Sequence, residues 1–121
     1  MPFKEFWPLY LRAHSRPMTR AMHYLASLVG LSFTIWAVAA GDGWLCAIGI
    51  GSGYAMAVLS HWVFEGNQPL ILVHPVWGAV SDVRMCLLAL TGRLGCELAR
   101  AKDAGGAVLV TGGGRGLAAN P

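Results

Sequence analysis

The chain has 121 residues, of which 55% are apolar and only 12% are charged, and its mean hydropathy is +0.53. Ordinary soluble domains carry about 25% charged residues, so this composition is typical of a membrane protein. The formal net charge of +3 comes from basic residues that are spread along the chain, without a basic and aromatic stripe, which argues against nucleic acid as a partner. Three cysteines without a paired spacing indicate reduced thiols rather than a disulfide framework.

The first predicted element is a short amphipathic helix over residues 3–14. Its aromatic and leucine side chains recur at helical spacing and are interleaved with basic residues, which suits either a helix at a membrane interface or a packing helix in a bundle. Pro17 can open the next helix, because its fixed φ suits the first helical position. Arg20 and His23 are then neighbours on the first turns of that helix.

Two uncharged runs, Tyr24–Ala40 and Trp44–Ser60, are separated by a glycine-containing turn. Each run is 17 residues long and approaches, with its flanking residues, the roughly 20 that a spanning helix needs. The sequence therefore predicts a transmembrane helical hairpin over residues 22–64. Gly49 and Gly53 form a GxxxG pattern, which suits close packing either inside the hairpin or in a dimer.

The charges around the predicted hairpin set its orientation. Basic residues precede the first run and follow the second, whereas the turn between them carries a single acidic residue. The positive-inside rule then predicts that both termini lie in the cytoplasm, so the start of the first span and the end of the second share one membrane face. Five polar residues can meet at that face. They are His14, Arg20, His23, His61 and Glu65.

The rest of the chain changes in character. Residues 76–94 predict a third helix, which we expect to lie at or dip into the cytoplasmic interface, with a short third span as the alternative. The Gly- and Ala-rich stretch 95–121 has little apolar surface to bury and is predicted to be disordered. The predicted fold is thus an all-α integral membrane bundle, with a membrane domain over residues 1–94 and a tail over residues 95–121.

The four histidines, His14, His23, His61 and His74, lie outside the uncharged runs but near their cytoplasmic ends. Ionisable groups at membrane depth are costly and are a functional signal by default. Imidazole and carboxylate ligands together suit non-haem iron, so the sequence predicts an iron site. A structural polar cluster in a membrane scaffold protein is the alternative. Haem between the spans is disfavoured, because these histidines lie at the ends of the helices.

Several motifs together resemble the Mpo1-like family over about residues 3–94. They are Phe6-Trp7-Pro8-Leu9-Tyr10 with His14, then Pro17 with Arg20 and His23, then Ser60-His61-Trp62-Val63-Phe64-Glu65-Gly66-Asn67-Gln68-Pro69, and finally His74-Pro75. The resemblance implies an iron(II)-dependent dioxygenase that takes O2 and a 2-hydroxy fatty acid and removes one carbon by α-oxidation.

The resemblance also implies roles for single residues. His14, His23 and His61 correspond to the family's histidines and are candidate ligands of Fe2+, with His74 as a fourth. Glu65 corresponds to the glutamate of the family motif and is a candidate catalytic residue.

Arg20 is the second candidate catalytic residue, and it can hold the substrate carboxylate or orient Glu65. The chain departs from the yeast-like pattern, which has glycine at the position of Ser60 and glutamine at that of Ala57. It looks like the shorter bacterial branch, which implies a bacterial inner membrane.

Overall fold

The computed structural model describes residues 1–118, with side chains described for residues 1–106. Within that range every regular element is a helix. The elements are α1 (Phe3–Ala13), α2 (Pro17–Ala40), α3 (Gly43–Ser60), a π-helical turn (His61–Glu65), a 3-10 turn (Leu70–Leu72), α4 (Pro75–Leu90) and α5 (Leu94–Ala118). The predicted all-α fold class is confirmed.

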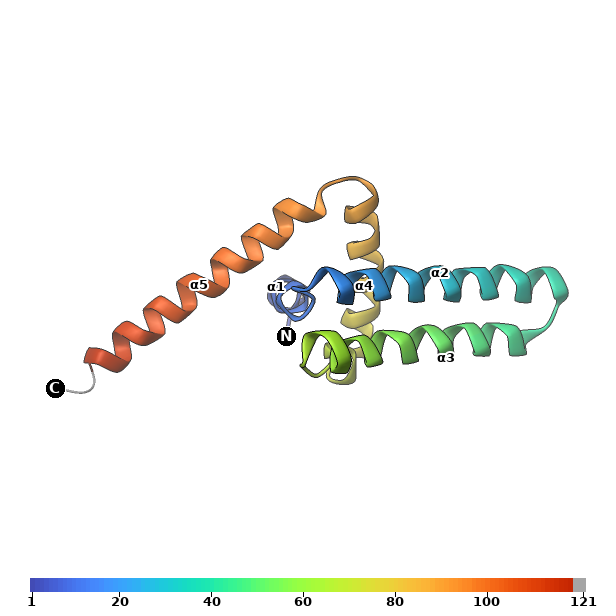
Figure 1. The fold of residues 1–121 in the computed structure, drawn as a ribbon, viewed down its shortest axis with the longest axis horizontal. Helices are drawn as coiled ribbons and strands as arrows, with labels where there is room; N and C mark the ends of the chain where they lie inside the picture. The colour runs from blue at the N-terminus through green and yellow to red at the C-terminus, as the bar shows by residue number, and fades with distance from the viewer. Residues whose placement is uncertain (119–121) are drawn as a thin grey trace.

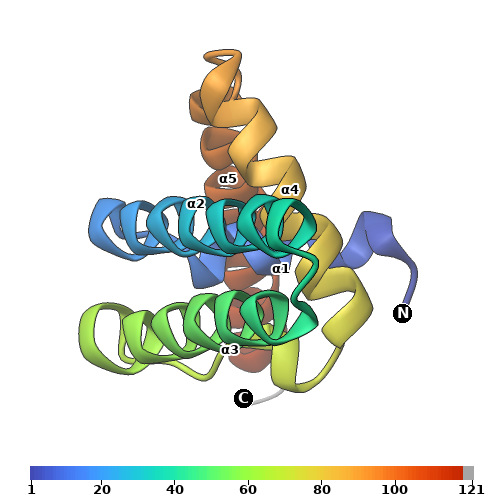
Figure 2. The ribbon, with the colours of Figure 1, turned by 90° about the vertical axis from the view of Figure 1, so that its right-hand side faces the viewer.

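Helices α2 and α3 lie side by side as an antiparallel hairpin (Figures 1 and 2). Gly41 ends α2 in the left-handed region, with φ of 66°, where a side chain would be strained. Asp42 then begins α3 as its N-cap, because its Oδ1 accepts a hydrogen bond from the backbone N–H of Trp44 at 3.0 Å. By length and composition, α2 and the continuous segment Gly43–Glu65 are both able to cross a membrane.

Two glycines of α3 allow the hairpin helices to approach each other closely. A Cβ atom at Gly49 would lie 2.4 Å from the Cβ of Phe33, and one at Gly53 would lie 3.0 Å from the backbone oxygen of Ala26. Real side chains do not tolerate the first of these distances. The GxxxG pattern therefore serves the contact between α2 and α3.

The buried core lies outside the hairpin. Helix α1 sits at the open end of the hairpin, opposite the turn, and α4 and α5 pack around it (Figure 1). The core side chains come from these three helices, and they are Phe6, Trp7, Tyr10, Leu11, Met85, Leu94 and Ala101. The hairpin itself buries few large apolar side chains, so most of its leucines, isoleucines and valines remain exposed.

Helix α4 crosses the hairpin instead of running alongside it (Figure 2). Its 16 residues are fewer than the roughly 20 that a spanning helix needs. Gly78 lets α4 pack closely on the preceding turn, since a Cβ there would lie 3.0 Å from the Cα of Ile71. The predicted third helix is therefore present, and it is not a third member of the hairpin.

The structure describes a helix over much of the stretch that the sequence analysis took for a tail. Residues 94–118 form α5, and Leu94 and Ala101 are buried against α1. Two hydrogen bonds fasten α5 to α1: the indole of Trp7 donates to Glu97 at 3.0 Å, and Arg12 donates to the backbone oxygen of Ala101 at 3.2 Å. These tertiary contacts outweigh the low helix propensity of the glycines. Residues 119–121 lie outside the described residues.

The close approach at Gly49 generates a testable prediction. Gly49→Leu is expected to lower the free energy of unfolding by about 1–3 kcal/mol, because the new side chain overpacks against Phe33. Denaturant unfolding in detergent micelles, followed by circular dichroism, measures the change. Gly51→Leu is the matched control, since a Cβ at Gly51 meets nothing within 4 Å and gains the same helix propensity. Equal losses in both variants would contradict the packing argument.

Candidate metal centre

Three histidines from three different elements meet at the open end of the hairpin. His14 ends α1, His23 lies on the second turn of α2, and His61 begins the π-helical turn after α3. Their side chains are only 1%, 4% and 1% exposed. One ring nitrogen of each lies within 4.8 Å of the others, which is a grouping able to hold a metal ion. The structure therefore brings together three of the four predicted histidine ligands.

The Nδ1 atom of each histidine faces an oxygen atom. His14 Nδ1 lies 2.7 Å from the backbone oxygen of Tyr10, and His23 Nδ1 lies 2.9 Å from that of Thr19. His61 Nδ1 lies 2.8 Å from Asn67 Oδ1. The amide of Asn67 is fixed in this orientation, because its Nδ2 donates to a backbone oxygen at 3.1 Å. Since these oxygens only accept, each Nδ1 carries the proton.

A neutral imidazole with its proton on Nδ1 leaves Nε2 as an unprotonated acceptor. His14 Nε2 lies 3.0 Å from His23 Nε2 and 3.1 Å from His61 Nε2. Burial lowers the pKa of His14 to about 2, assisted by its proximity to His23, so a proton does not bridge the nitrogens at neutral pH. Three lone pairs that face one another without a proton form a site that favours a cation.

The spacing of these nitrogens matches a shared metal ion. Two imidazole nitrogens that each lie about 2.1 Å from one ion are about 3.0 Å apart when they subtend a right angle, and about 3.4 Å apart at a tetrahedral angle. The two separations of 3.0 and 3.1 Å agree with the right angle. Both separations that involve His14 Nε2 are thus short enough for one metal ion, if bound, to be shared by His14 and each of the other two histidines.

The π-helical turn helps to position His61. A π-helical turn contains an extra residue relative to an α-helix, and such turns are frequent at functional sites. The backbone N–H groups of Gly66 and Asn67 both donate to the oxygen of His61, at 2.7 and 3.2 Å. Gly66 adopts the left-handed region, with φ of 72°, and ends the helix there. The chain can then turn back and bring the Asn67 amide against the ring of His61.

Glu65 and Arg20 lie beside the histidines without joining them. The Glu65 carboxylate accepts hydrogen bonds from the hydroxyl of Ser15, at 3.0 Å, and from the backbone N–H of Arg16. Arg20 Nη1 donates to the backbone oxygens of His14 and Ser15, each at 2.8 Å. In the part of the chain with described side chains, these two residues form no ion pair with each other. Both fasten the connector between α1 and α2, and their catalytic roles stay predictions.

His74 occupies a different place. It is the N-cap residue of α4, and its half-buried ring meets the ring of Phe6 edge-on at a centroid distance of 5.7 Å. It is not part of the three-histidine group found among the described residues. The structure thus does not bring His74 together with the other three histidines, and its role as a fourth ligand stays a prediction.

Three residues to which the sequence analysis assigned no role also surround the centre. Asn67 holds His61, Tyr10 stacks on His14 at a centroid distance of 4.0 Å, and the Tyr10 hydroxyl donates to Asp82. Burial raises the pKa of Asp82 to about 6, partly offset by this hydrogen bond, and burial also raises the pKa of Tyr10. Asp82 had the pattern of a surface charge, so only the helix crossing reveals that it faces inward.

A small cavity of about 20 Å³ adjoins the histidines. Pro69, Leu70 and Ile71 form one wall of this cavity, and Gly78 and Asp82 of α4 form another wall. This volume is comparable to that of one water molecule. The centre is therefore accessible to an ion but closed to a larger ligand in this conformation.

Comparison with known proteins gives a match at the level of the family. A family model described as "2-hydroxy-palmitic acid dioxygenase Mpo1-like" matches residues 1–94. The chain belongs to the Mpo1-like family. Searches of curated proteins and of solved structures found no match. The resemblance that the motifs indicated is thus confirmed, and the three clustered histidines of this Mpo1-like protein all lie inside the matched region.

The hydrogen bond between Asn67 and His61 generates a second prediction. Asn67→Ala frees Nδ1 of His61, so the ring can rotate and exchange tautomers, and the affinity for a divalent metal is expected to fall by about 10–100-fold. Titration of the metal-free protein with Co2+ or Fe2+, followed by absorbance or calorimetry, measures the change. Gln68→Ala is the control, because Gln68 is exposed and contacts Trp62 instead. An unchanged affinity in Asn67→Ala would show that the amide does not position the ligand.

Asp82 gives a prediction about pH. Its pKa in the folded protein, about 6, exceeds the ordinary value of 3.8, so the folded state binds more protons than the unfolded state between these values. The stability of the metal-free protein should therefore fall as pH rises from about 4 to 6, by at most about 3 kcal/mol from this group. Asp82→Asn retains an acceptor for Tyr10 and should remove this decline.

The comparison is made by unfolding both proteins in the presence of a chelator at pH 4, 5, 6 and 7. Asp82→Asn should be the more stable protein above pH 6, and the two curves should converge near pH 4. A variant that is less stable at pH 7 would mean that the charged carboxylate is stabilising.

Proposed function

We propose that this Mpo1-like protein is an iron(II)-dependent dioxygenase that acts on 2-hydroxy fatty acids at a membrane. The observation that carries the proposal is the convergence of three unprotonated Nε2 atoms, each with its Nδ1–H held by an oxygen. Such a second layer of acceptors is the usual support of metal-bound histidines, because it fixes the ring and raises its basicity. His14, His23 and His61 are the residues that hold Fe2+.

The chemistry of the ligands and the family description together favour iron. Neutral imidazole suits iron, zinc, copper and nickel, so the histidines alone do not select among these metals. The family description names a dioxygenase of 2-hydroxy-palmitic acid, and reduction of O2 needs a redox-active metal. When bound, the ferrous ion supplies O2 activation and a positive centre for the carboxylate and 2-hydroxyl oxygens of the substrate.

The chain's own residues prepare this site. Burial keeps His14 unprotonated at neutral pH, and the oxygens opposite each Nδ1 keep the three rings aimed at one point. Tyr10 and Asp82 line the same cavity and place a hydrogen-bonding pair beside it. Because the cavity holds about 20 Å³, a fatty acid can enter only if the segment around Leu70 and Ile71 moves away from α4.

The hairpin is the part that we place in the membrane. Only 17% of each apolar window is buried inside the protein, whereas the core helix of a soluble protein is mostly buried. The exposed side chains are large and apolar, and a contiguous apolar surface of this kind favours lipid as its surroundings. The basic residues favour a cytoplasmic location for both termini, and the membrane that we propose is the inner membrane of a bacterium. The histidines lie at that side, where a fatty acid carboxylate would be found.

Metal analysis tests the ligand set. Anaerobically purified protein in detergent is expected to contain about one iron per chain, and His61→Ala is expected to lose it, because two imidazoles bind far more weakly than three. His74→Ala is the matched control and should retain iron, since its ring packs on Phe6. Loss of iron from His74→Ala would indicate that His74 is also an iron ligand.

An activity assay tests the reaction. With 2-hydroxypalmitate and O2, the iron-loaded protein should release pentadecanoic acid, carbon dioxide and water, which together account for every atom of the hydroxy acid and of one O2. Oxygen uptake and product analysis by mass spectrometry measure this. His61→Ala should show no uptake above background. Absence of both iron and oxygen uptake after ferrous reconstitution of the wild-type protein would favour a structural, non-catalytic role for the histidine cluster.

A further inference from the structure

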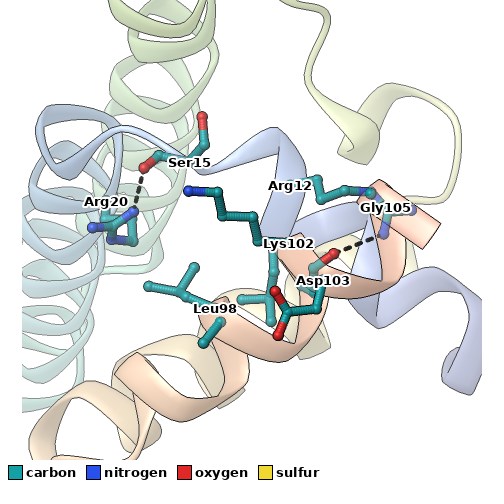
Figure 3. Close-up of a pocket in the computed structure, with 11 residues that line it drawn as sticks. Arg12, Ser15, Arg20, Leu98, Lys102, Asp103 and Gly105 are labelled. Carbon is teal, nitrogen blue, oxygen red and sulfur yellow. Dashed lines mark hydrogen bonds between the residues drawn. The ribbon is translucent and has the colours of Figure 1, made fainter. Parts of the chain in front are cut away.

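A second and much larger cavity lies between α1, the start of α2 and α5 (Figure 3). Its volume is about 1140 Å³, against about 20 Å³ for the cavity beside the histidines. None of the three clustered histidines lines it. The side chains that matter most to its chemistry are Leu11, Arg12, Arg20, Leu98, Lys102 and Asp103. This cavity is therefore distinct from the candidate metal centre.

The polar side of the cavity is basic. Arg12, Arg20 and Lys102 contribute three cations against the single carboxylate of Asp103. In Figure 3 the Lys102 side chain extends its ammonium group toward Ser15. Lys102 has no ion-pair partner in the part of the chain with described side chains. The excess of positive charge predicts an anionic ligand.

The remaining lining is apolar. Leu11 and Leu98 face the cavity with Ala99 and Ala101, so an anion that is bound beside the basic residues would lie next to hydrocarbon. Free inorganic phosphate has no apolar part and gains nothing from such a surface. An amphipathic anion can bury its hydrocarbon chain against it. The two halves of the lining thus point to a lipid with a negatively charged head.

We propose that this cavity binds the head group of an anionic phospholipid. Basic pockets between membrane helices on the cytoplasmic side are the usual sites for such head groups. Arg20 lies on the first turns of α2, so the cavity is at head-group level if the hairpin spans the membrane. The inference rests on that membrane placement in the proposed function, and it does not depend on the metal or on the dioxygenase reaction.

Helix α5 supplies lining residues that lie outside the region matched by the family model. Residues 98–106 supply more than half of the lining, and they lie beyond residues 1–94, which match the family model. The hydrogen bonds of α5 to Trp7 and Arg12 hold these residues against α1. A lipid bound in this cavity would contact both α1 and α5 and would connect them to the membrane surface.

Native mass spectrometry of the full-length protein in detergent tests the proposal, with dioleoyl phosphatidylglycerol as the probe. The expected result is retention of this lipid at least about tenfold better than dioleoyl phosphatidylcholine, with no retention of inorganic phosphate. Lys102→Glu should reduce retention by about tenfold. Lys4→Glu is the matched control, because Lys4 is an exposed cation of α1 outside the cavity, and it should behave as the wild type.

A second variant tests the shape of the site without changing its charge. Ala99→Phe places a ring in the lining at an exposed helical position, so it should fold normally and weaken retention of phosphatidylglycerol. Equal retention of the two phospholipids, or equal loss in Lys102→Glu and Lys4→Glu, would overturn the proposal. Stronger retention of oleate than of phosphatidylglycerol would also overturn it, in favour of a fatty acid site. Phosphatidylglycerol binding should persist in His61→Ala, which would show that the lipid site is independent of the metal centre and of the dioxygenase proposal.

Discussion

The mutual approach of three unprotonated histidine nitrogens is the constraint on which the rest of this structure depends. His14, His23 and His61 come from α1, α2 and the end of α3, so their contact ties the N-terminal helix to both hairpin helices at once. Without a cation the facing lone pairs repel one another in a buried environment. A bound metal ion would relieve this unfavourable contact, and it would then stabilise this end of the folded protein.

Polar residues around the histidines divide into two groups with different tasks. Asn67 and the backbone oxygens of Tyr10 and Thr19 hold the rings themselves, through Nδ1. Glu65 and Arg20 instead hold the connector between α1 and α2. Glu65 accepts hydrogen bonds from Ser15 and Arg16, and Arg20 donates to the backbone oxygens of His14 and Ser15. In this structure Glu65 therefore contributes to the site by holding the connector that leads from α1 to α2.

Helix α1 joins the two chemical features of the protein. One of its faces supplies the core against α4 and α5, and its last turn supplies the ring stack from Tyr10 to His14. Leu11 belongs to this core and also borders the basic cavity, together with Arg12. The hairpin, by contrast, contributes two histidines and a large exposed apolar surface.

Hydrophobic periodicity, charge bias and motif spacing predicted α1, the hairpin, a helix near α4 and the meeting of His14, His23 and His61, because these features depend on local sequence and on simple topology. Tertiary structure decided the rest. Asp82 faces inward because α4 crosses the hairpin beside Tyr10, and the start of α5 packs on α1 through Leu94 and Ala101. The sequence likewise did not determine that His74 lies apart from the other three histidines. The position of His74 depends on the turn that precedes α4. Contacts between distant segments leave no periodic signal in the sequence.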